Sequence, residues 1–333
     1  MTKPYLKLFD IYYGTKCNLA CRQCDTRSDI DRTTENDPHI DTILEGITLA
    51  KEKFDIDLYS FIGGEPLYYL DKIDVILTHI RKIDPTAKIQ ISTNGALLSK
   101  KLDAVVSIIL KHNCSFFVCN HFAAFDERMT SKLTESVDKL VNILQLTKGD
   151  ANKFLGEFLG LDNLRKDPYL DTWVSQNTEY FLGEQPTDHY YYNDNVFIHF
   201  RPQVDFKMHH YMINGKPKPF MTGTPEISYE KGCSSPMCSF LLDKKLYKCS
   251  ALGTLTKFLE FHGSMDDPDW QKYLNYKPLD LETCTDDEVQ NFHATKYCAV
   301  SECDMCGTSH FNRTREDVIH VQTIRMERKV KSI

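Results

Sequence analysis

The feature that most constrains the fold is a regular alternation of short apolar runs with longer amphipathic segments through residues 5–144. The apolar runs have the length of buried strands and predict strands at 5–12, 58–62, 88–92 and 115–119. Between and after them, apolar residues recur at helical spacing, which predicts four helices, the first over 40–54. That spacing is carried by Ile40, Ile43, Leu44 and Ile47, then by Ile73, Ile76, Leu77 and Ile80, then by Leu102, Val105, Val106 and Ile109, and finally by Leu133, Val137, Leu140, Val141 and Leu144.

Strand and helix therefore alternate at least four times, which predicts a parallel sheet with helical crossovers. Two further segments, 153–159 and 195–201, are candidates for a fifth and a sixth strand, with a helix somewhere in 168–182. A closed eight-unit barrel usually needs ~250 residues, so an opened barrel of about six units fits better. The predicted fold class is α/β, a partial (β/α)6 barrel of the TIM type.

Composition limits what such a chain does. The 333 residues include 40 Lys plus Arg and 47 Asp plus Glu, for a net charge of −7, which argues against a general binder of duplex DNA or anionic membranes. No apolar run approaches ~18 residues, and the N-terminus lacks the features of a signal peptide. Twelve cysteines in a chain without a leader favour metal or cluster ligation in a reducing compartment over disulfides. We therefore expect a cytoplasmic protein without membrane contact.

Three of the cysteines, Cys17, Cys21 and Cys24, form a C-x3-C-x2-C pattern directly after the first predicted strand. Three thiolates on one loop can bind three irons of a cubane cluster and leave the fourth iron open to a chelating molecule. Zinc is the alternative, but structural zinc takes four ligands, and no histidine or fourth cysteine lies within ten residues of the three. A chance spacing of the cysteines is the remaining alternative.

Two later motifs follow predicted strands. Gly-Gly-Glu-Pro at 63–66 comes after the second strand, where glycines would let the backbone approach a ligand closely, and Ser-Thr-Asn at 92–94 ends the third strand. Together with the cysteine loop, in this order and spacing, these motifs resemble the radical S-adenosylmethionine (radical SAM) superfamily over roughly the first 200 residues. The resemblance implies that a [4Fe–4S] cluster on Cys17, Cys21 and Cys24 chelates S-adenosylmethionine (SAM). It further implies that the methionine part lies at Gly63, Gly64, Glu65 and Pro66, and the sugar at Ser92, Thr93 and Asn94.

One position departs from the family pattern. The residue before the third cysteine is often aromatic and lies near adenine, but here it is Gln23. The adenine contact is therefore not predicted, whereas the cluster is. His121, at the end of the fourth predicted strand, is a candidate substrate ligand or proton carrier, and a hydrogen-bonded structural histidine is the alternative. Cys114 and Cys119 flank that strand and are expected to be small buried apolar residues.

The composition changes between 202 and 232, where Pro and Gly become frequent, and this change predicts a domain boundary near 205–215. The expected domains are residues 1–205, the barrel with the SAM site, and 206–333, a smaller cysteine-rich α+β domain. Seven cysteines fall in this second part: Cys233, Cys238, Cys249, Cys284, Cys298, Cys303 and Cys306. Residues 239–248 predict a hairpin that turns at Asp243-Lys244 and brings the cysteines at its two ends together.

This layout resembles the auxiliary-cluster extensions of radical SAM enzymes, called SPASM domains with two clusters and twitch domains with one. Because the two-cluster pattern needs a further late run of cysteines, one auxiliary [4Fe–4S] cluster is the better interpretation. The preferred ligands are Cys233, Cys249, Cys303 and Cys306, with Cys238 as the main competitor. Cys298 and Cys284 are substitutes or thiols near the substrate, although Cys284 fits a helix start better because Thr285–Glu288 is a good capping sequence. A structural zinc site on the same thiolates is the alternative.

The resemblance implies reductive cleavage of SAM to a 5′-deoxyadenosyl radical, which abstracts hydrogen from a C–H bond of an amino-acid-containing substrate, a peptide or a modified small molecule. It also implies a reductant protein such as flavodoxin or ferredoxin. A redox-neutral isomerase acting on an amino-acid-decorated base in phage-type DNA is a second hypothesis, left open by the basic tail at 323–333. A non-catalytic iron–sulfur or zinc scaffold is the hypothesis of another class.

Overall fold

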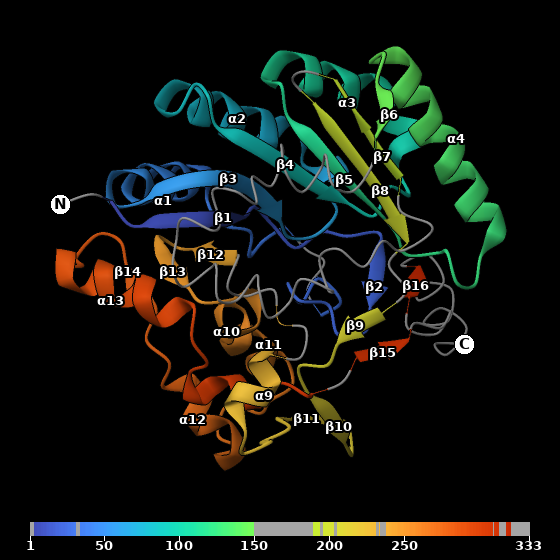
Figure 1. Ribbon diagram of the computed structural model, residues 1–333. Coiled ribbons are helices and arrows are strands. Elements are labelled where there is room, and N and C mark those ends of the chain that lie inside the picture. Colours follow the sequence, from blue (N-terminus) through green and yellow to red (C-terminus); the bar gives the residue numbers. More distant parts are fainter. Residues whose placement is uncertain are drawn as a thin grey trace.

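The computed structural model describes residues 3–30, 34–149, 189–193, 196–202, 205–230, 233, 238–308, 310–312 and 318–320. Its largest element is a ten-stranded sheet with the strand order β14-β13-β12-β1-β3-β4-β5-β8-β7-β6 (Figure 1). Within those ranges, no helix combines the length and the apolar character that crossing a membrane requires.

Neighbouring strands in the middle of this sheet are parallel from β12 through to β8. These strands are β12 (Cys238–Leu242), β1 (Tyr5–Tyr12), β3 (Asp55–Ile62), β4 (Lys88–Thr93), β5 (Ser115–Asn120) and β8 (Phe197–Pro202). Antiparallel strands complete both edges: β13 (Lys245–Tyr247) and β14 (Leu279–Asp280) on one side, β7 (His189–Tyr192) and β6 (Thr147–Gly149) on the other. The fold is therefore α/β with a mixed, largely parallel sheet.

Four helices connect the first parallel strands and cover one face of the sheet (Figure 1). They are α1 (Ile40–Lys53), α2 (Leu70–Ile83), α3 (Leu98–His112) and α4 (Glu127–Ile143). Local signals set their ends: the carboxylate of Asp126 accepts from the backbone N–H of Met129 at the start of α4, and Asn113 closes α3 with φ 48°. All four helices lie where the apolar periodicity predicts them.

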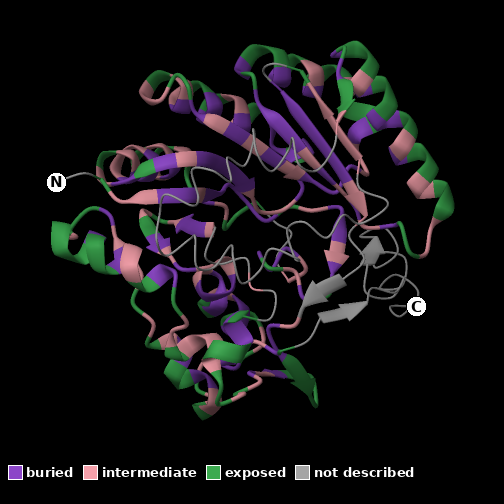
Figure 2. Cartoon of the chain, in the orientation of Figure 1, coloured by how far each residue is buried: buried purple, intermediate pink, exposed green. Residues whose placement is uncertain are grey.

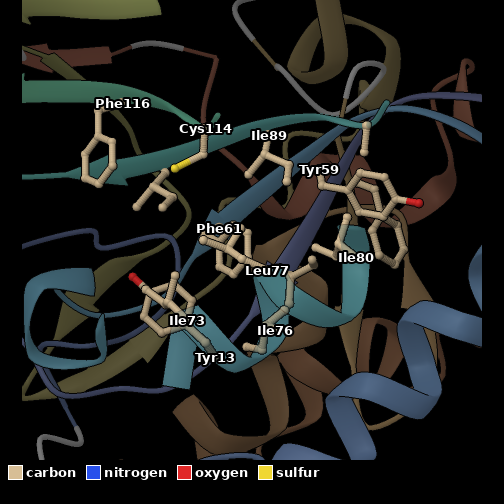
Figure 3. Close-up of a cluster of buried hydrophobic side chains, with 14 of the residues drawn as sticks. Tyr13, Tyr59, Phe61, Ile73, Ile76, Leu77, Ile80, Ile89, Cys114 and Phe116 are labelled. Carbon is tan, nitrogen blue, oxygen red and sulfur yellow. The ribbon is translucent and has the colours of Figure 1, made fainter. Parts of the chain in front are cut away.

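The main core lies between these helices and the sheet. Figure 3 shows Ile73, Ile76 and Leu77 of α2 near Phe61 of β3. Figure 2 shows the same division, with buried residues on the strands and exposed residues on the outer sides of the helices. Cys114, just before β5, is fully buried in this core, as expected for a small apolar residue.

The first four predicted strands are confirmed, with β3 starting three residues earlier, at Asp55. The segment 195–201 corresponds to β8, whereas the strand predicted at 153–159 and the helix within 168–182 lie outside the described residues. Sequence patterns did not indicate the edge strands β6 and β7, because strands of three and four residues are too short to show a periodic pattern.

The chain after residue 205 lies mainly on the other side of the sheet from α2 to α4 (Figure 1). Its helices are α9 (Pro225–Glu230), α10 (Ser250–Gly253), α11 (Leu255–Phe261), α12 (Gln271–Leu274) and α13 (Asp286–Lys296). Short strand pairs join β10 (Tyr211–Ile213) to β11 (Lys216–Lys218), β9 (Asp205–Lys207) to β15 (His310–Asn312), and β2 (Leu19–Cys21) to β16 (Val318–His320).

The predicted hairpin is confirmed as β12 and β13, which turn at Asp243 and Lys244 with φ 49° and 59°. Positive φ at both turn positions is the geometry of a type I′ turn, which matches the twist of the two strands. Strand β12 pairs in parallel with β1, so the hairpin extends the sheet of the first half. The division into domains at 205/206 stays a prediction.

Candidate functional site

The three cysteines of the first loop converge on one apolar cluster beyond the carboxyl end of β1. Cys21 is buried there beside Leu19 and Phe122, and Cys17 and Cys24 pack against the same cluster. The loop backbone also contacts a sulfur directly, since the N–H of Leu19 donates to Sγ of Cys17 at 3.4 Å. The sequence thus brings three soft thiol donors to one place, which is the donor set that iron–sulfur clusters use.

The glycine pair after β3 lies directly against this loop. A Cβ on Gly64 would lie 2.1 Å from the carbonyl oxygen of Lys16, and one on Gly63 would lie 2.6 Å from that of Gly14. Backbone hydrogen bonds fix the approach, because the N–H of Gly64 donates to Gly14 O at 2.8 Å and that of Glu65 donates to Lys16 O at 2.9 Å. We call Gly63 and Gly64 the glycine cradle. Only glycine fits at these positions because the backbones approach so closely, as predicted from the motif.

Glu65 joins the end of β3 to the end of β4. Its buried carboxylate accepts from the hydroxyl of Thr93 at 2.5 Å and from the backbone N–H groups of Asn94 and Leu67 at 2.9 and 3.2 Å. Burial raises the pKa of this carboxyl to about 7, although these hydrogen bonds act in the opposite direction. Glu65 therefore braces the two strand ends, with Pro66 beginning the short 3-10 turn that follows (Pro66–Tyr68).

Asn94 connects that brace to the cysteine loop. Its Nδ2 donates to Oδ1 of the buried Asn18 at 3.0 Å and lies 3.7 Å from Sγ of Cys17. Of the three residues predicted for the sugar, Thr93 and Asn94 are thus engaged with the protein, whereas Ser92 is half-buried one position earlier on β4. The predicted motifs come together in one place. Which of their residues contact SAM and which only hold the site together stays a prediction.

His121 lies in the turn directly after β5 and is half-buried. Its neighbour Phe122 donates its backbone N–H to Oδ1 of Asn120 at 3.0 Å and packs against Cys21, which places this turn beside the cysteine loop. The location agrees with a residue facing the site. The role of His121 as a substrate ligand stays a prediction.

Gln23, the departure from the family pattern, ties the cysteine loop to the second half of the chain. The residue has φ 62°, and its buried amide accepts from the backbone N–H of His209 at 2.8 Å and donates to the carbonyl of His210 at 2.9 Å. Asp25 adds a contact of 2.6 Å from its carboxylate to Nε2 of His209. This connection is not predictable from the sequence, because nothing in the residues around Gln23 indicates a partner 186 positions away.

A buried arginine reinforces the same connection. Arg27 is almost completely buried, and its guanidinium lies 4.1 Å from the ring centroid of Phe258 in α11. Burial lowers the pKa of Arg27, with nearby acidic groups such as Asp29 opposing the shift. The cysteine loop is therefore held from both sides, by the glycine pair of the first half and by His209, His210 and Phe258 of the second.

The later cysteines divide between two apolar clusters. Cys233, Cys238 and Cys303 lie beside Tyr229 and Tyr297. Burial, followed by the neighbouring thiol of Cys233, raises the pKa of Cys249 to about 12, and Cys303 contributes in the same direction. Cys249 itself packs, together with Cys306, against the second cluster, which contains Phe258 and Trp270.

Cys306, the fourth preferred ligand, faces a different partner. Its Sγ lies 3.3 Å from Nδ1 of His209, whose Nε2 contacts Asp25. Cys284 packs against the main core and precedes a complete capping box between Thr285 and Glu288, so the predicted helix start is confirmed. Cys298 is exposed.

Within the described ranges, no three His, Cys, Asp or Glu side chains lie close enough together to hold a metal ion. The thiols of the first loop nevertheless share one cluster beside a cradle that a Cβ would fill, so the residues fit a cluster bound by three cysteines. Both ligand sets, including the choice among Cys233, Cys238, Cys249, Cys303 and Cys306, stay predictions.

Comparison with known proteins matches residues 11–149 to the model of the radical SAM superfamily. Radical SAM cyclopropyl synthase TigE from Paramaledivibacter caminithermalis is 26% identical over 169 residues, which is 45% of this chain and 34% of that protein. Molybdenum cofactor biosynthesis protein 1 from Dictyostelium discoideum is 24% identical over 196 residues (57% and 30%), and GTP 3′,8-cyclase from Limosilactobacillus fermentum is 32% identical over 95 residues (27% and 27%). The chain thus spans about a third or less of the length of these relatives.

Among solved structures, Streptococcus suis SuiB bound to precursor peptide SuiA matches with a TM-score of 0.35 and 15% sequence identity. The match covers 90% of this chain and 76% of SuiB. A TM-score at this level does not extend the function of SuiB to the present chain.

Proposed function

Since this chain is a radical SAM family enzyme, we propose that it binds a [4Fe–4S] cluster through Cys17, Cys21 and Cys24 and uses SAM to abstract hydrogen from a C–H bond of an amino-acid-containing substrate. When bound, the cluster supplies the electron that cleaves SAM into methionine and a 5′-deoxyadenosyl radical. The polypeptide supplies the binding site, the orientation of the reactants and the exclusion of water.

The observation that carries this proposal is the convergence of three separate motifs on one loop. The glycine cradle hydrogen-bonds to the backbone of residues 14–16, and Asn94 reaches both Asn18 and the sulfur of Cys17. A non-catalytic scaffold would have no use for a backbone approach that excludes even a methyl group at Gly64. The parallel strands also end together here, which is the edge where barrel enzymes build their sites.

We propose a finer architecture on the same basis: a partial barrel whose site is completed by a smaller auxiliary-cluster domain. Cys233 and Cys303 share one apolar cluster and both raise the pKa of Cys249, which supports one auxiliary [4Fe–4S] cluster on these three cysteines, with Cys238 or Cys306 as the fourth ligand. This cluster would accept an electron from the substrate radical, position the substrate or stabilise the fold. A flavodoxin or ferredoxin would deliver the reducing electron.

The test is the formation of 5′-deoxyadenosine from SAM after anaerobic reconstitution and reduction with dithionite. The wild-type chain should form it, and the Cys21→Ala variant should form none. Cys114→Ala is the matched control, because Cys114 is buried in the main core just before β5, at the amino end of that strand, and it should retain the wild-type rate. Equal amounts of 5′-deoxyadenosine in the wild-type chain and in Cys21→Ala would refute the proposed function.

A further inference from the structure

The inner face of the sheet carries a set of side chains that the cofactor motifs do not use. Phe116 and Val118 of β5, and Ile198 and Phe200 of β8, belong to the core beneath α3 and α4. Because side chains alternate along a strand, Phe117 and the other intervening residues of these two strands face the opposite side, away from the helices.

Three aromatic rings form a row across this inner face. Phe117 of β5 is opposite His199 of β8, which is opposite Tyr190 of β7. The rings of Phe117 and His199 lie 4.7 Å apart, and those of His199 and Tyr190 are stacked at 4.4 Å. On its other side, Phe117 is opposite Ser92 of β4, so the row begins at a residue of the predicted SAM site.

Arg201 lies one step closer to the carboxyl ends of the strands. It is opposite Cys119, and its guanidinium is 5.8 Å from the ring centroid of Phe117. The Nε atom of Arg201 is buried and has no hydrogen-bond partner in the part of the chain that the structure describes. A buried guanidinium nitrogen without an acceptor costs free energy, which a ligand that supplies the acceptor would recover.

The register places Arg201 within substrate reach of the cysteine loop. Asn94 follows Thr93, which is opposite Val118, and Val118 is in turn opposite Phe200. Asn94 and Arg201 are therefore at the same level of the sheet and two strands apart, which corresponds to ~10 Å. Asn94 itself contacts the loop, so a small molecule could span the distance between the cysteines and the guanidinium.

We propose that Arg201 is the anchor for an anionic group of the substrate, a carboxylate or a phosphate, and that Phe117, stacked in an aromatic row with His199 and Tyr190, forms the wall against which the guanidinium lies. The planar guanidinium donates to both oxygens of such a group, and the aromatic wall lowers the local dielectric and strengthens that pairing. This inference rests on the proposed function for the location of the reacting centre. It adds the chemical class by which the substrate is held.

The test measures binding by ligand-observed NMR with paired probes that differ in one anionic group. N-acetylphenylalanine and N-acetylhistidine are compared with their C-terminal amides, and GMP is compared with guanosine. The variants are Arg201→Gln, which removes the positive charge and the paired N–H donors of the guanidinium, and Arg201→Lys, which keeps the charge but not the paired donors. Arg128→Gln, on the exposed surface of α4, is the control for loss of one positive charge.

We expect the wild type and Arg128→Gln to bind at least one anionic probe about tenfold more tightly than its neutral partner, because charge-assisted bidentate hydrogen bonds are stronger than neutral ones. Arg201→Gln should lose that preference, and Arg201→Lys should keep part of it. A preference for the acids would identify a carboxylate, and a preference for GMP over guanosine would identify a phosphate.

Three results would overturn the inference: no preference in the wild type, an unchanged preference in Arg201→Gln, or a loss of S-adenosylhomocysteine binding in Arg201→Gln that exceeds the loss of probe binding. Unchanged thermal unfolding of Arg201→Gln shows that the variant is folded. A wild-type chain that forms 5′-deoxyadenosine but shows no charge preference contradicts the anchor alone, whereas a chain that forms none contradicts the proposed function.

Discussion

The contact between Gly64 and the cysteine loop makes a sharp prediction for Gly64→Ala. A methyl group there would lie 2.1 Å from the carbonyl oxygen of Lys16 and 2.7 Å from that of Thr15. Both neighbours are backbone atoms, so no side-chain rotation can relieve the clash. An ordinary carbon–oxygen contact needs about 3.2 Å or more, and the loop and the turn must therefore separate by roughly 1 Å.

That separation acts on stability and on the site. Overpacking of this kind costs about 1–3 kcal/mol, and stretching the hydrogen bonds of Gly64 and Glu65 to the loop adds about 1 kcal/mol each. Because Cys17 directly follows Lys16, the same movement displaces a predicted cluster ligand by roughly 1 Å. A misplacement of that size lowers the rate of a chemical step by up to about 10²-fold.

The assay combines urea unfolding of the metal-free chain with the rate of 5′-deoxyadenosine formation after reconstitution. Gly46→Ala is the matched control, because a methyl group there meets the side chain of Leu241 at 3.2 Å and the Cα atom of Lys244 at an ordinary contact distance of 3.5 Å, and sits in a helix that favours alanine. We expect Gly64→Ala to lose stability and at least tenfold in rate, with Gly46→Ala close to the wild type. A Gly64→Ala chain with wild-type stability and rate would refute the argument that only glycine fits the cradle.

Three further predictions follow from individual contacts. Asn94→Ala removes the donor to Asn18 and Cys17 and should speed the loss of iron to a chelator several-fold; an unchanged rate of iron loss would count against this contact. Arg81→Met should lower the urea-derived stability by about 2 kcal/mol, because Arg81 donates to carbonyl groups at the end of α3 and before β4; an unchanged midpoint would contradict this. Hydrogen bonding by Lys111 and then His112 lowers the pKa of Asp74 below 3.8. Asp74 therefore contributes to the free energy of unfolding at neutral pH, by under about 1 kcal/mol because the site is partly exposed. This contribution is lost as the pH falls through the lowered pKa. In Asp74→Asn, the free energy of unfolding should therefore fall less steeply as the pH is lowered. The same acid dependence as in the wild type would count against the ion pair.

The local part of this fold is predictable because short-range physics decides it. The apolar spacing of Ile73, Ile76, Leu77 and Ile80 fixes both the existence and the buried face of α2, and the pair Asp243-Lys244 fixes a hairpin turn. The glycine pair at 63–64 also indicates a close backbone approach. None of these inferences needs to know which distant segment lies opposite.

Long-range pairings are what the sequence does not reveal. No local property of β12 indicates that it pairs in parallel with β1, because both are short apolar strands that many partners would satisfy. The same holds for Gln23, whose buried amide meets residues 209 and 210. The contact between Cys306 and His209 has the same origin, since it depends on how segments 97 residues apart are placed in space.

The most direct test of the central claim is the iron and acid-labile sulfide content per chain after anaerobic purification, in the wild type and in a Cys17→Ala, Cys21→Ala, Cys24→Ala variant. Two cubane clusters predict ~8 Fe per chain in the wild type and ~4 in the variant. About 4 Fe in the wild type and none in the variant, with ~1 Zn in each, would keep the first cluster and make the later site structural. The same iron content in both chains would contradict the assignment of Cys17, Cys21 and Cys24 as cluster ligands.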